Sequence, residues 1–493
     1  MDHPEYLDPP HYDGSRLFFW VSKASGVPID LVNFVIGQLF ALLFAAIYRT
    51  AFHPSKASAT KRHCAALVGG VTLLYFCFGR HAYLVMFLTG VSYFITVFFP
   101  AKYVPQIILP LSLVYMGCVH IRRQLMSQTG FSLDVSAPVM VAVQKVTSIA
   151  FAWKDGSEKD QDKLTPLQKL QAVRKIPSML EYFSYILHFQ ACMTGPTVLY
   201  KDYIDYIYGT NYRKHIKSED ILEDSPCSAI PVQDPSPTKA VITKVVVSLI
   251  HALIFICICP MFSVGRFKDE EFFVSTTFYQ RMFYIIIVTT LARSKYYHAW
   301  LLADAICNAS GLGFNGWDEN GNTKWDLISN VKILDIEFAT SFRDTLSSWN
   351  IGTMRWLRYV GYERATFNPT VATYILSAVW HGFYPGYYLT FVFGALLTGV
   401  GRTLRRHVRP HFQSTSSSRK IYDVLTFLGS RVALAYVTMP FVLLEFWPSV
   451  RVYSSLYWYL HVLTILALVA VPKIFPAHRE KMSTKSKGVQ ESN

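Results

Sequence analysis

The chain has 493 residues, of which 52% are hydrophobic and only 16% are charged, and its mean hydropathy is +0.25. Soluble domains carry roughly 25% charged residues, so this composition excludes an ordinary soluble protein and favours a lipid environment. The net charge of +14 lies mainly in short loops between apolar runs, which is the pattern of a membrane protein rather than of a nucleic-acid-binding face.

Apolar runs follow one another almost from end to end, and a membrane-spanning helix needs roughly 17–25 mainly apolar residues. Eight runs are strong candidates: 30–48, 64–79, 82–99, 103–121, 240–263, 371–400, 431–448 and 452–472. Three further runs contain a charged residue, which indicates helices that face a cavity or other helices. These are 135–153 with Lys145, 178–200 with Glu181, and 273–296 with Arg281.

The loops predict an orientation in the membrane. Residues 49–63 and 401–420 contain several Lys and Arg but no Asp or Glu, so both loops should be cytosolic. The sequence thus predicts a lumenal N-terminal segment over 1–29, one membrane domain over 30–472 and a cytosolic polar tail over 473–493. Ends on opposite sides require an odd number of spans. We therefore expect an all-α polytopic helical bundle of about eleven spans.

One histidine stands alone in the longest apolar run. Residues 371–400 contain no Asp, Glu, Lys or Arg, and their one basic side chain is His381. Thirty helical residues would extend about 45 Å, but Gly382, Pro385 and Gly386 should break the helix just after the histidine. A broken helix at membrane depth is tolerated where it lines a cavity. His381 is therefore either a base in a cavity or a core histidine bonded to a neighbouring helix.

The segment before this run has a different pattern. Between Asp335 and Arg364, apolar side chains recur at steps of three and four, with basic residues around the remaining surface. This predicts an amphipathic helix at the membrane interface. Asn350 lies beside the apolar stripe, and by itself it could be an ordinary polar residue at a helix boundary.

Several ordered segments resemble the membrane-bound O-acyltransferase family, specifically its lysophospholipid acyltransferase branch. The matching segments extend over roughly residues 30–472: Gln144 to Phe151, Pro177 to Ser184, Gly195-Pro196 with Tyr200 to Tyr203, Trp300 to Gly316, Trp349-Asn350-Ile351 and Ser377 to Tyr388. Residues Asp344 to Arg364 and Trp380 to Tyr388 are most similar to the lysophosphatidylethanolamine and lysophosphatidylserine acyltransferases.

The resemblance implies a catalytic pair and a fold. The family's near-invariant histidine falls on His381, and its second polar catalytic residue falls on Asn350. The family fold is a bundle of about eleven spans around an internal catalytic chamber, in agreement with the count above. The aromatic residues beside the pair are candidate walls for the acyl chain or headgroup, or only packing residues: Trp349, Trp380, Tyr384 and Tyr387.

The implied activity is transfer of a fatty acyl group, such as oleoyl, from acyl-CoA to a lysophospholipid in the endoplasmic reticulum membrane. The acceptors would be lysophosphatidylethanolamine, lysophosphatidylserine or lysophosphatidylcholine, in phospholipid remodelling. We expect acyl-CoA as a co-substrate, no cofactor, no metal and no nucleic acid. No G-x-S-x-G, H-E-x-x-H or Walker A motif is present, so serine-hydrolase and zinc mechanisms have no support.

Three other interpretations stay open at this stage. A family member that acylates a protein would differ in its acceptor. A polytopic transporter would also suit a broken helix with a histidine, but the sequence has neither an inverted repeat nor a row of ionisable residues. A non-catalytic scaffold would have no need of both His381 and Asn350.

Overall fold

The computed structural model describes residues 7–9, 11–126, 133–212, 215 and 234–476. Its regular secondary structure is helical, apart from one isolated bridge between Trp317 and Thr323. The all-α prediction is therefore confirmed for this part of the chain. Residues 477–493 of the predicted tail, residues 1–6 and 10 of the predicted lumenal segment, and the internal residues 127–132, 213–214 and 216–233 lie outside it.

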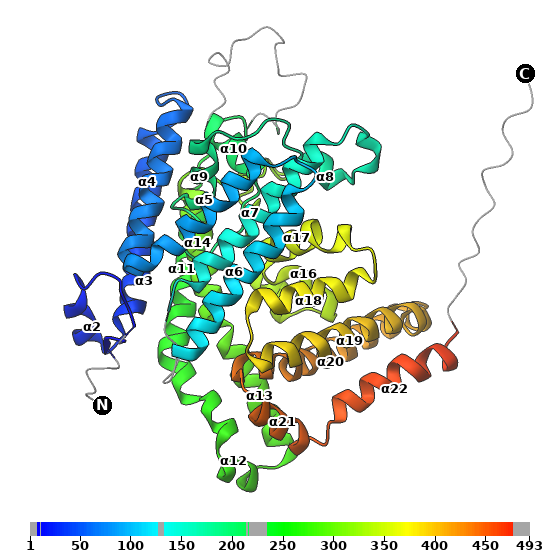
Figure 1. Cartoon of the computed structure of the whole chain (residues 1–493). Coiled ribbons are helices and arrows are strands. Elements are labelled where there is room, and N and C mark those ends of the chain that lie inside the picture. The colour runs from blue at the N-terminus through cyan, green and yellow to red at the C-terminus, as the bar shows by residue number, and fades with distance from the viewer. Residues whose placement is uncertain (1–6, 10, 127–132, 213–214, 216–233, 477–493) are drawn as a thin grey trace, which may run out of the picture.

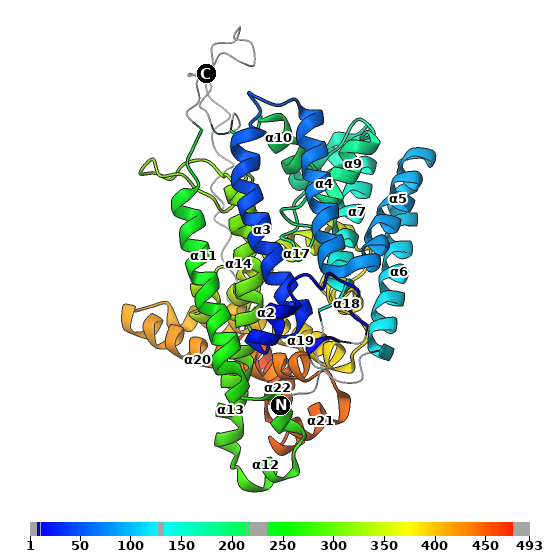
Figure 2. The same cartoon turned by 90° about the vertical axis from the view of Figure 1, so that its left-hand side faces the viewer.

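The N-terminal half contains a series of long helices followed by short ones. In chain order the elements are α2 (Phe19–Ser25), α3 (Ile29–Ala51), α4 (Ala59–Phe78), η1 (Gly79–Ala82), α5 (Tyr83–Phe98), α6 (Val104–Met126), α7 (Ser136–Ser157), η2 (Gln161–Lys163), α8 (Pro166–Gln171), α9 (Met179–Leu187) and α10 (Tyr200–Tyr208). Figures 1 and 2 show α3, α4, α5 and α6 running in similar directions along the long dimension of the molecule.

The second half alternates long helices with short ones. Its elements are α11 (Thr238–Leu253), η5 (Ile254–Ile258), η6 (Cys259–Met261), η7 (Val264–Lys268), α12 (Glu270–Ser275), α13 (Phe278–Ala292), α14 (Ser294–Ala309), α15 (Ile333–Glu337), α16 (Phe342–Ser348), α17 (Ile351–Val360), η8 (Tyr362–Arg364), α18 (Pro369–His381), α19 (Pro385–His407), η9 (Arg409–Phe412), α20 (Ser416–Leu443), α21 (Phe446–Ser455) and α22 (Tyr459–Ile474).

The buried apolar side chains form three clusters. The largest joins α3 to α10 with parts of α14 and α17, and it includes Trp356 and Trp380. A second cluster joins α12 and α13 to α19, α20 and α21. A third, smaller one packs Trp349 against residues of α14 and α15. Figure 1 shows α16, α17 and α18 between the two larger groups of helices, so these short helices lie where the three clusters meet.

The structure supports a multi-pass membrane protein. By length and composition, five helical ranges among the described residues could span a membrane: Ile29–Ala51, Ala59–Phe98, Val104–Met126, Thr238–Lys268 and Ser416–Leu443. The pair α21 and α22 would be a sixth if it counts as one span, although it is bent by 76°. The expected total of about eleven spans stays a prediction.

Two of the three predicted spans that contain a charged residue have wrong bounds. The run 178–200 is not one helix, because α9 ends at Leu187 and the mostly buried residues that follow are irregular up to α10. Lys145 of α7 satisfies carbonyls that this helix end leaves unpaired, since its amino group donates to the carbonyls of Tyr185 and Ile186 at 3.2 and 3.0 Å. The run 273–296 contains α13 but only the start of α14. The polar residues of α14 made this helix too polar to be predicted as a span.

The expected amphipathic helix from Asp335 to Arg364 is also wrong, because the segment forms α15, α16 and α17 in succession. Ser341 caps α16 by accepting a hydrogen bond from the Asp344 amide at 3.1 Å. Asn350 adopts a left-handed conformation with φ of 49°, which ends one helix and starts the next. Trp356 and Tyr359 of α17 are fully buried, whereas Met354 and Arg358 of the same helix are exposed. The position of α17 at the membrane interface stays a prediction.

The break predicted after His381 is confirmed. The run 371–400 forms two helices, α18 and α19, separated at Gly382, Phe383 and Tyr384. Gly382 has φ of 111°, a conformation that glycine adopts without a steric penalty. Pro385 then starts α19 at a position where a missing amide proton costs nothing.

A buried ion pair holds the end of this short-helix region against α7. The Arg364 guanidinium donates to the Asp155 carboxylate at 3.0 and 2.6 Å, and the Tyr359 hydroxyl donates to the same carboxylate at 2.8 Å. Asp155 is 2% exposed. Removal of one partner from a buried pair leaves an uncompensated charge, which costs about 3–5 kcal/mol.

We therefore expect Arg364→Ala to lower the melting temperature of the detergent-purified protein by several degrees. Arg358→Ala is the matched control, because Arg358 pairs with Glu363 at 3.0 Å while its side chain is 69% exposed, and exposed pairs contribute about 0–1 kcal/mol. Thermal unfolding followed by intrinsic fluorescence measures both. Equal melting temperatures for the two variants would contradict the structural role of the Asp155 pair.

Candidate active site

His381 is the last residue of α18, and local capping fixes where this helix begins and ends. Asn368 accepts hydrogen bonds from the amides of Thr370 and Val371 at 3.1 and 3.3 Å, and Pro369 occupies the first turn. At the other end, a Cβ added to Gly382 would lie 3.1 Å from a ring atom of His120. The close packing of α6 on this turn and the φ of 111° at residue 382 together favour glycine directly after the histidine.

A backbone contact fixes the protonation of the His381 ring. Its Nδ1 atom lies 2.8 Å from the carbonyl oxygen of Ser377, one helical turn earlier. A carbonyl oxygen only accepts, so Nδ1 carries the proton and donates. In the neutral imidazole, Nε2 then has the free lone pair. The ring therefore presents Nε2 as an acceptor for a proton.

Aromatic side chains surround this ring. Ring centroids lie 4.7 Å from His381 for Trp380, 4.9 Å for Phe391, 5.3 Å for Phe441 and 5.7 Å for Tyr387. Three of these residues come from α19 and α20, which carry the second apolar cluster. The shell restricts rotation of the imidazole and gives it largely apolar neighbours.

The neighbouring Trp380 anchors α18 in the opposite direction, toward the first cluster. Its indole N–H donates to the Met140 carbonyl of α7 at 3.1 Å, and its ring lies 5.9 Å from that of Trp356. The carbonyl of Trp380 lies 3.2 Å from Nε2 of His120 on α6, so His120 donates there. Successive residues of α18 thus connect the two large clusters.

Asn350 occupies the junction between α16 and α17. Its side-chain oxygen accepts a hydrogen bond from the amide group of Asn330 at 3.1 Å. In the part of the chain that the structure describes, no acceptor lies within hydrogen-bond distance of its own NH₂ group. The contact with Asn330 fixes which end of the amide is the donor, so the two N–H groups of Asn350 are available to a ligand.

A buried polar network holds this junction in place. Asn330 accepts from the Gly352 amide with its side-chain oxygen and from the Ile351 amide with its carbonyl, both at 2.9 Å. Gln144 of α7 donates to the Thr353 hydroxyl at 2.8 Å and accepts from the Thr197 hydroxyl. The first turn of α17 is thereby tied to two other segments, one of them α7.

The remaining candidate residues divide between the surroundings of Asn350 and those of His381. Trp349 packs on α14, with ring centroids 5.1 Å from Trp300, 5.7 Å from Tyr296 and 5.8 Å from Tyr297. Tyr384 contacts the ring of Tyr387 at 5.9 Å. His381, Trp380, Tyr384 and Tyr387 therefore form one group, whereas Asn350 and Trp349 form a second. The two groups are joined through Trp356 on α17 and Trp380 on α18.

Cavities lie elsewhere among the described residues. One opens between η1 and α6, and another lies between α19 and the bent pair α21–α22. Neither is lined by His381 or Asn350, so the internal catalytic chamber stays a prediction. The role of the four aromatic residues as substrate walls also stays a prediction.

Sequence reasoning missed several residues that build the site. His120 belongs to an expected span, but the span pattern says nothing about its contact with the end of α18. Asn330 lies in an irregular segment without periodicity, and its importance depends on a contact 20 residues further along the chain. Gln144 was part of a matching segment, which is the one signal that pointed to this network.

The described residues thus form a multi-pass helical membrane protein in which an oriented histidine lies at the end of a helix. The comparisons identify the family. The profile described as the MBOAT, membrane-bound O-acyltransferase, family matches residues 94–439. Lysophospholipid acyltransferase 6 of Drosophila melanogaster is 44% identical over 489 residues, which cover 99% of this chain and 68% of that protein.

Other relatives cover most of both chains. Membrane-bound glycerophospholipid O-acyltransferase 2 of Gallus gallus is 42% identical over 96% of this chain and 90% of the relative. The lysophospholipid acyltransferase of Saccharomyces cerevisiae is 32% identical over 76% of this chain and 63% of the relative. The chain therefore belongs to the membrane-bound O-acyltransferase family and is an acyltransferase.

The Gln144 network gives a test of how α17 is held. We expect Gln144→Leu to lower the thermal stability of the purified protein, because each buried hydroxyl left without a partner costs about 1–3 kcal/mol. Thr353→Val should cost less in the Gln144→Leu background than in the wild type, since the two side chains share one hydrogen bond. Additive losses in the double variant would show that the two residues are not coupled.

Proposed function

We propose that the protein is an acyl-CoA-dependent lysophospholipid O-acyltransferase. The observation that carries the proposal is the oriented His381, whose Nε2 is free to accept a proton because Nδ1 is bound to the Ser377 carbonyl. The acceptor class is supported by the relatives, which are named lysophospholipid acyltransferases or glycerophospholipid O-acyltransferases. A lysophospholipid has one free glycerol hydroxyl, which is the group that a general base would activate.

The proposed reaction is a single direct transfer. The glycerol hydroxyl oxygen attacks the thioester carbonyl carbon while His381 Nε2 takes the hydroxyl proton. The tetrahedral intermediate collapses, the new C–O ester bond remains, and the C–S bond breaks to release the CoA thiolate, which regains the proton from the imidazolium. A thiolate is an adequate leaving group, because thiol pKa values near ~8.5 lie far below those of alcohols. Such base assistance contributes about 10²–10⁴-fold.

Asn350 supplies the complementary function in this proposal. Its NH₂ group would donate a hydrogen bond to the thioester oxygen as negative charge develops there, or hold the acceptor in line. A preorganised donor of this kind contributes about 10²–10³-fold. The Asn330 contact supports the role, since it fixes the direction of the amide before substrate binds.

The finer specificity follows from the resemblance. We propose lysophosphatidylethanolamine, lysophosphatidylserine and lysophosphatidylcholine as acceptors, unsaturated acyl-CoA such as oleoyl-CoA as donor, and the endoplasmic reticulum membrane as the location. The test uses microsomes from cells that express the chain, with labelled oleoyl-CoA and a panel of lysophospholipids. Formation of a labelled diacyl phospholipid supports the proposal and identifies the headgroup. Labelling of a peptide with none of any lysophospholipid would instead support a protein acyltransferase.

His381→Ala should lower the acyl transfer rate by about 10²–10⁴-fold, because the base is lost. Ser377→Ala is the matched control, since the histidine binds the backbone carbonyl of residue 377 and not its side chain. The control should keep most of the activity at equal protein level, measured by the same microsomal assay. A His381→Ala variant as active as the wild type would overturn the assigned role.

Asn330→Ala should lower the transfer rate by acting through Asn350. The substitution removes the donor that orients the Asn350 amide and the acceptor for the Gly352 amide. The loss should be no larger than the about 10²–10³-fold expected for Asn350→Ala. In the Asn350→Ala background, Asn330→Ala should cause little further loss. Independent, multiplicative losses would show that Asn330 does not act through Asn350.

A further inference from the structure

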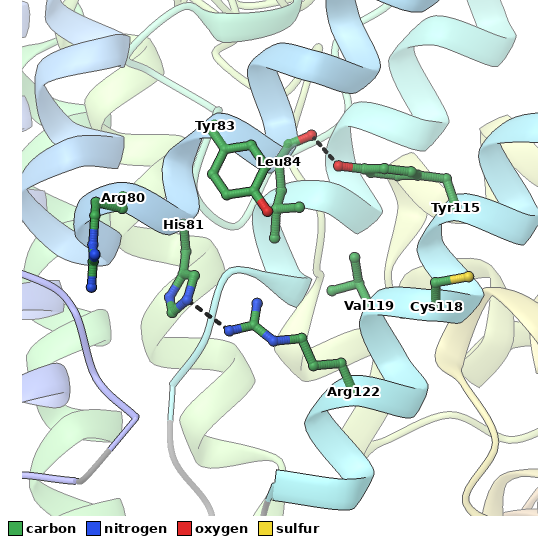
Figure 3. A pocket seen from close by; sticks show the side chains of 8 residues that line it. All are labelled: Arg80, His81, Tyr83, Leu84, Tyr115, Cys118, Val119 and Arg122. Atoms are coloured by element: carbon green, nitrogen blue, oxygen red, sulfur yellow. Dashed lines mark hydrogen bonds between the residues drawn. The ribbon is translucent and has the colours of Figure 1, made fainter.

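The cavity between η1 and α6 lies apart from the candidate site and has its own chemistry. It has a volume of about 400 Å³, within the range of small-molecule sites. Figure 3 shows the Arg122 side chain extending from α6 toward His81 of η1, with Tyr83, Leu84 and Val119 beside it. A cationic end is therefore combined with largely apolar and aromatic walls.

The charges around this cavity leave one positive charge without a carboxylate partner. Arg80 is bound to Asp13 at 3.0 Å, and its guanidinium holds the pKa of the Asp13 carboxyl below its usual range. Arg123 is 3.6 Å from Asp134. Arg122 makes one hydrogen bond, in which it donates to Nε2 of His81 at 2.8 Å, and no carboxylate pairs with it among the described residues.

The half-buried Arg122 guanidinium thus has donors to spare. An arginine carries five N–H donors in a planar fork that matches phosphate oxygens. Because His81 accepts at Nε2, its neutral ring carries the remaining proton on Nδ1 and adds a further donor at the cavity wall. This set suits one monoanionic phosphodiester better than a carboxylate-rich or strongly charged ligand.

The position of the cavity suits a lipid. It lies where α5 begins and along the C-terminal half of α6, with Arg122 in the last two turns, a level at which interfacial Tyr and Arg residues gather in membrane proteins. Farther along the same two helices, Phe87, Leu111 and Val114 are 56%, 40% and 66% exposed. From Arg122 to Leu111, α6 extends about 16 Å, roughly half of a ~30 Å hydrocarbon core.

We infer that this cavity binds a membrane phospholipid, with its phosphodiester on Arg122 and His81 and its acyl chains along the exposed side of α5 and α6. Neither His381 nor Asn350 lines this cavity, so it is a different site from that of the candidate catalytic pair. The inference does not depend on the proposed reaction. A bound lipid would fill the gap between η1 and α6 and neutralise Arg122.

The exposed thiol of Cys118 gives a direct readout, since it lines the cavity. The full chain, purified in detergent, is treated with N-ethylmaleimide, and site-specific alkylation rates are followed by peptide mass spectrometry. Dioleoylphosphatidylcholine should slow alkylation of Cys118 several-fold. The exposed Cys64 and Cys257 are internal references, and their rates should not change. Unchanged reference rates in each variant also verify its fold.

Three arms separate the sources of the effect. Dioleoylglycerol has the same hydrocarbon without the phosphodiester and should not protect Cys118, and neither should inorganic phosphate. Arg122→Gln should abolish protection, Arg122→Lys should keep part of it, and Arg406→Gln, which removes an exposed arginine of α19, should keep all of it. Protection by dioleoylglycerol or by inorganic phosphate alone, or full protection in Arg122→Gln, would overturn the inference.

Discussion

Helix ends inside a membrane protein need partners from the protein itself, because lipid offers none to the freed backbone groups. This constraint shapes the region around His381. Lys145, fully buried in α7, donates to the last carbonyls of α9. Asn330 accepts from the first amides of α17, and His120 donates to the Trp380 carbonyl near the end of α18. Each of these polar residues therefore satisfies backbone groups that a helix end leaves unpaired.

The same constraint explains why the candidate catalytic groups lie at helix ends. His381 is the last residue of α18, and Asn350 precedes the first residue of α17. A side chain at a helix end can point away from the regular helical surface. The backbone at that end stays fixed by the residues that hydrogen-bond its unpaired groups. Preorganisation of this kind is what acyl transfer requires, since the donor and base have to be in position before charge develops. The aromatic side chains around His381 also give the base a largely apolar surrounding.

The sequence predicted the features that depend on composition and local chemistry. Low charge and long apolar runs indicated a helical membrane protein, and Gly382 with Pro385 indicated the break after His381. It failed where a tertiary contact decides the outcome. The periodicity of residues 335–364 is that of one helix, but the left-handed Asn350, held by Asn330, divides it. Residues 178–200 are apolar enough for a span, but α9 ends at Leu187, where Lys145 of α7 closes its last carbonyls. Both closing residues lie far away in the sequence.

The most direct test of the account is a structure of the protein with lysophosphatidylethanolamine and a non-hydrolysable thioether analogue of oleoyl-CoA. We expect the free glycerol hydroxyl within about 2.6–3.2 Å of His381 Nε2, with the Asn350 amide beside the position of the reacting acyl carbon. The Nδ1 contact with the Ser377 carbonyl should remain. A hydroxyl bound to a different base, or a His381 ring turned so that Nε2 faces away from both ligands, would contradict it.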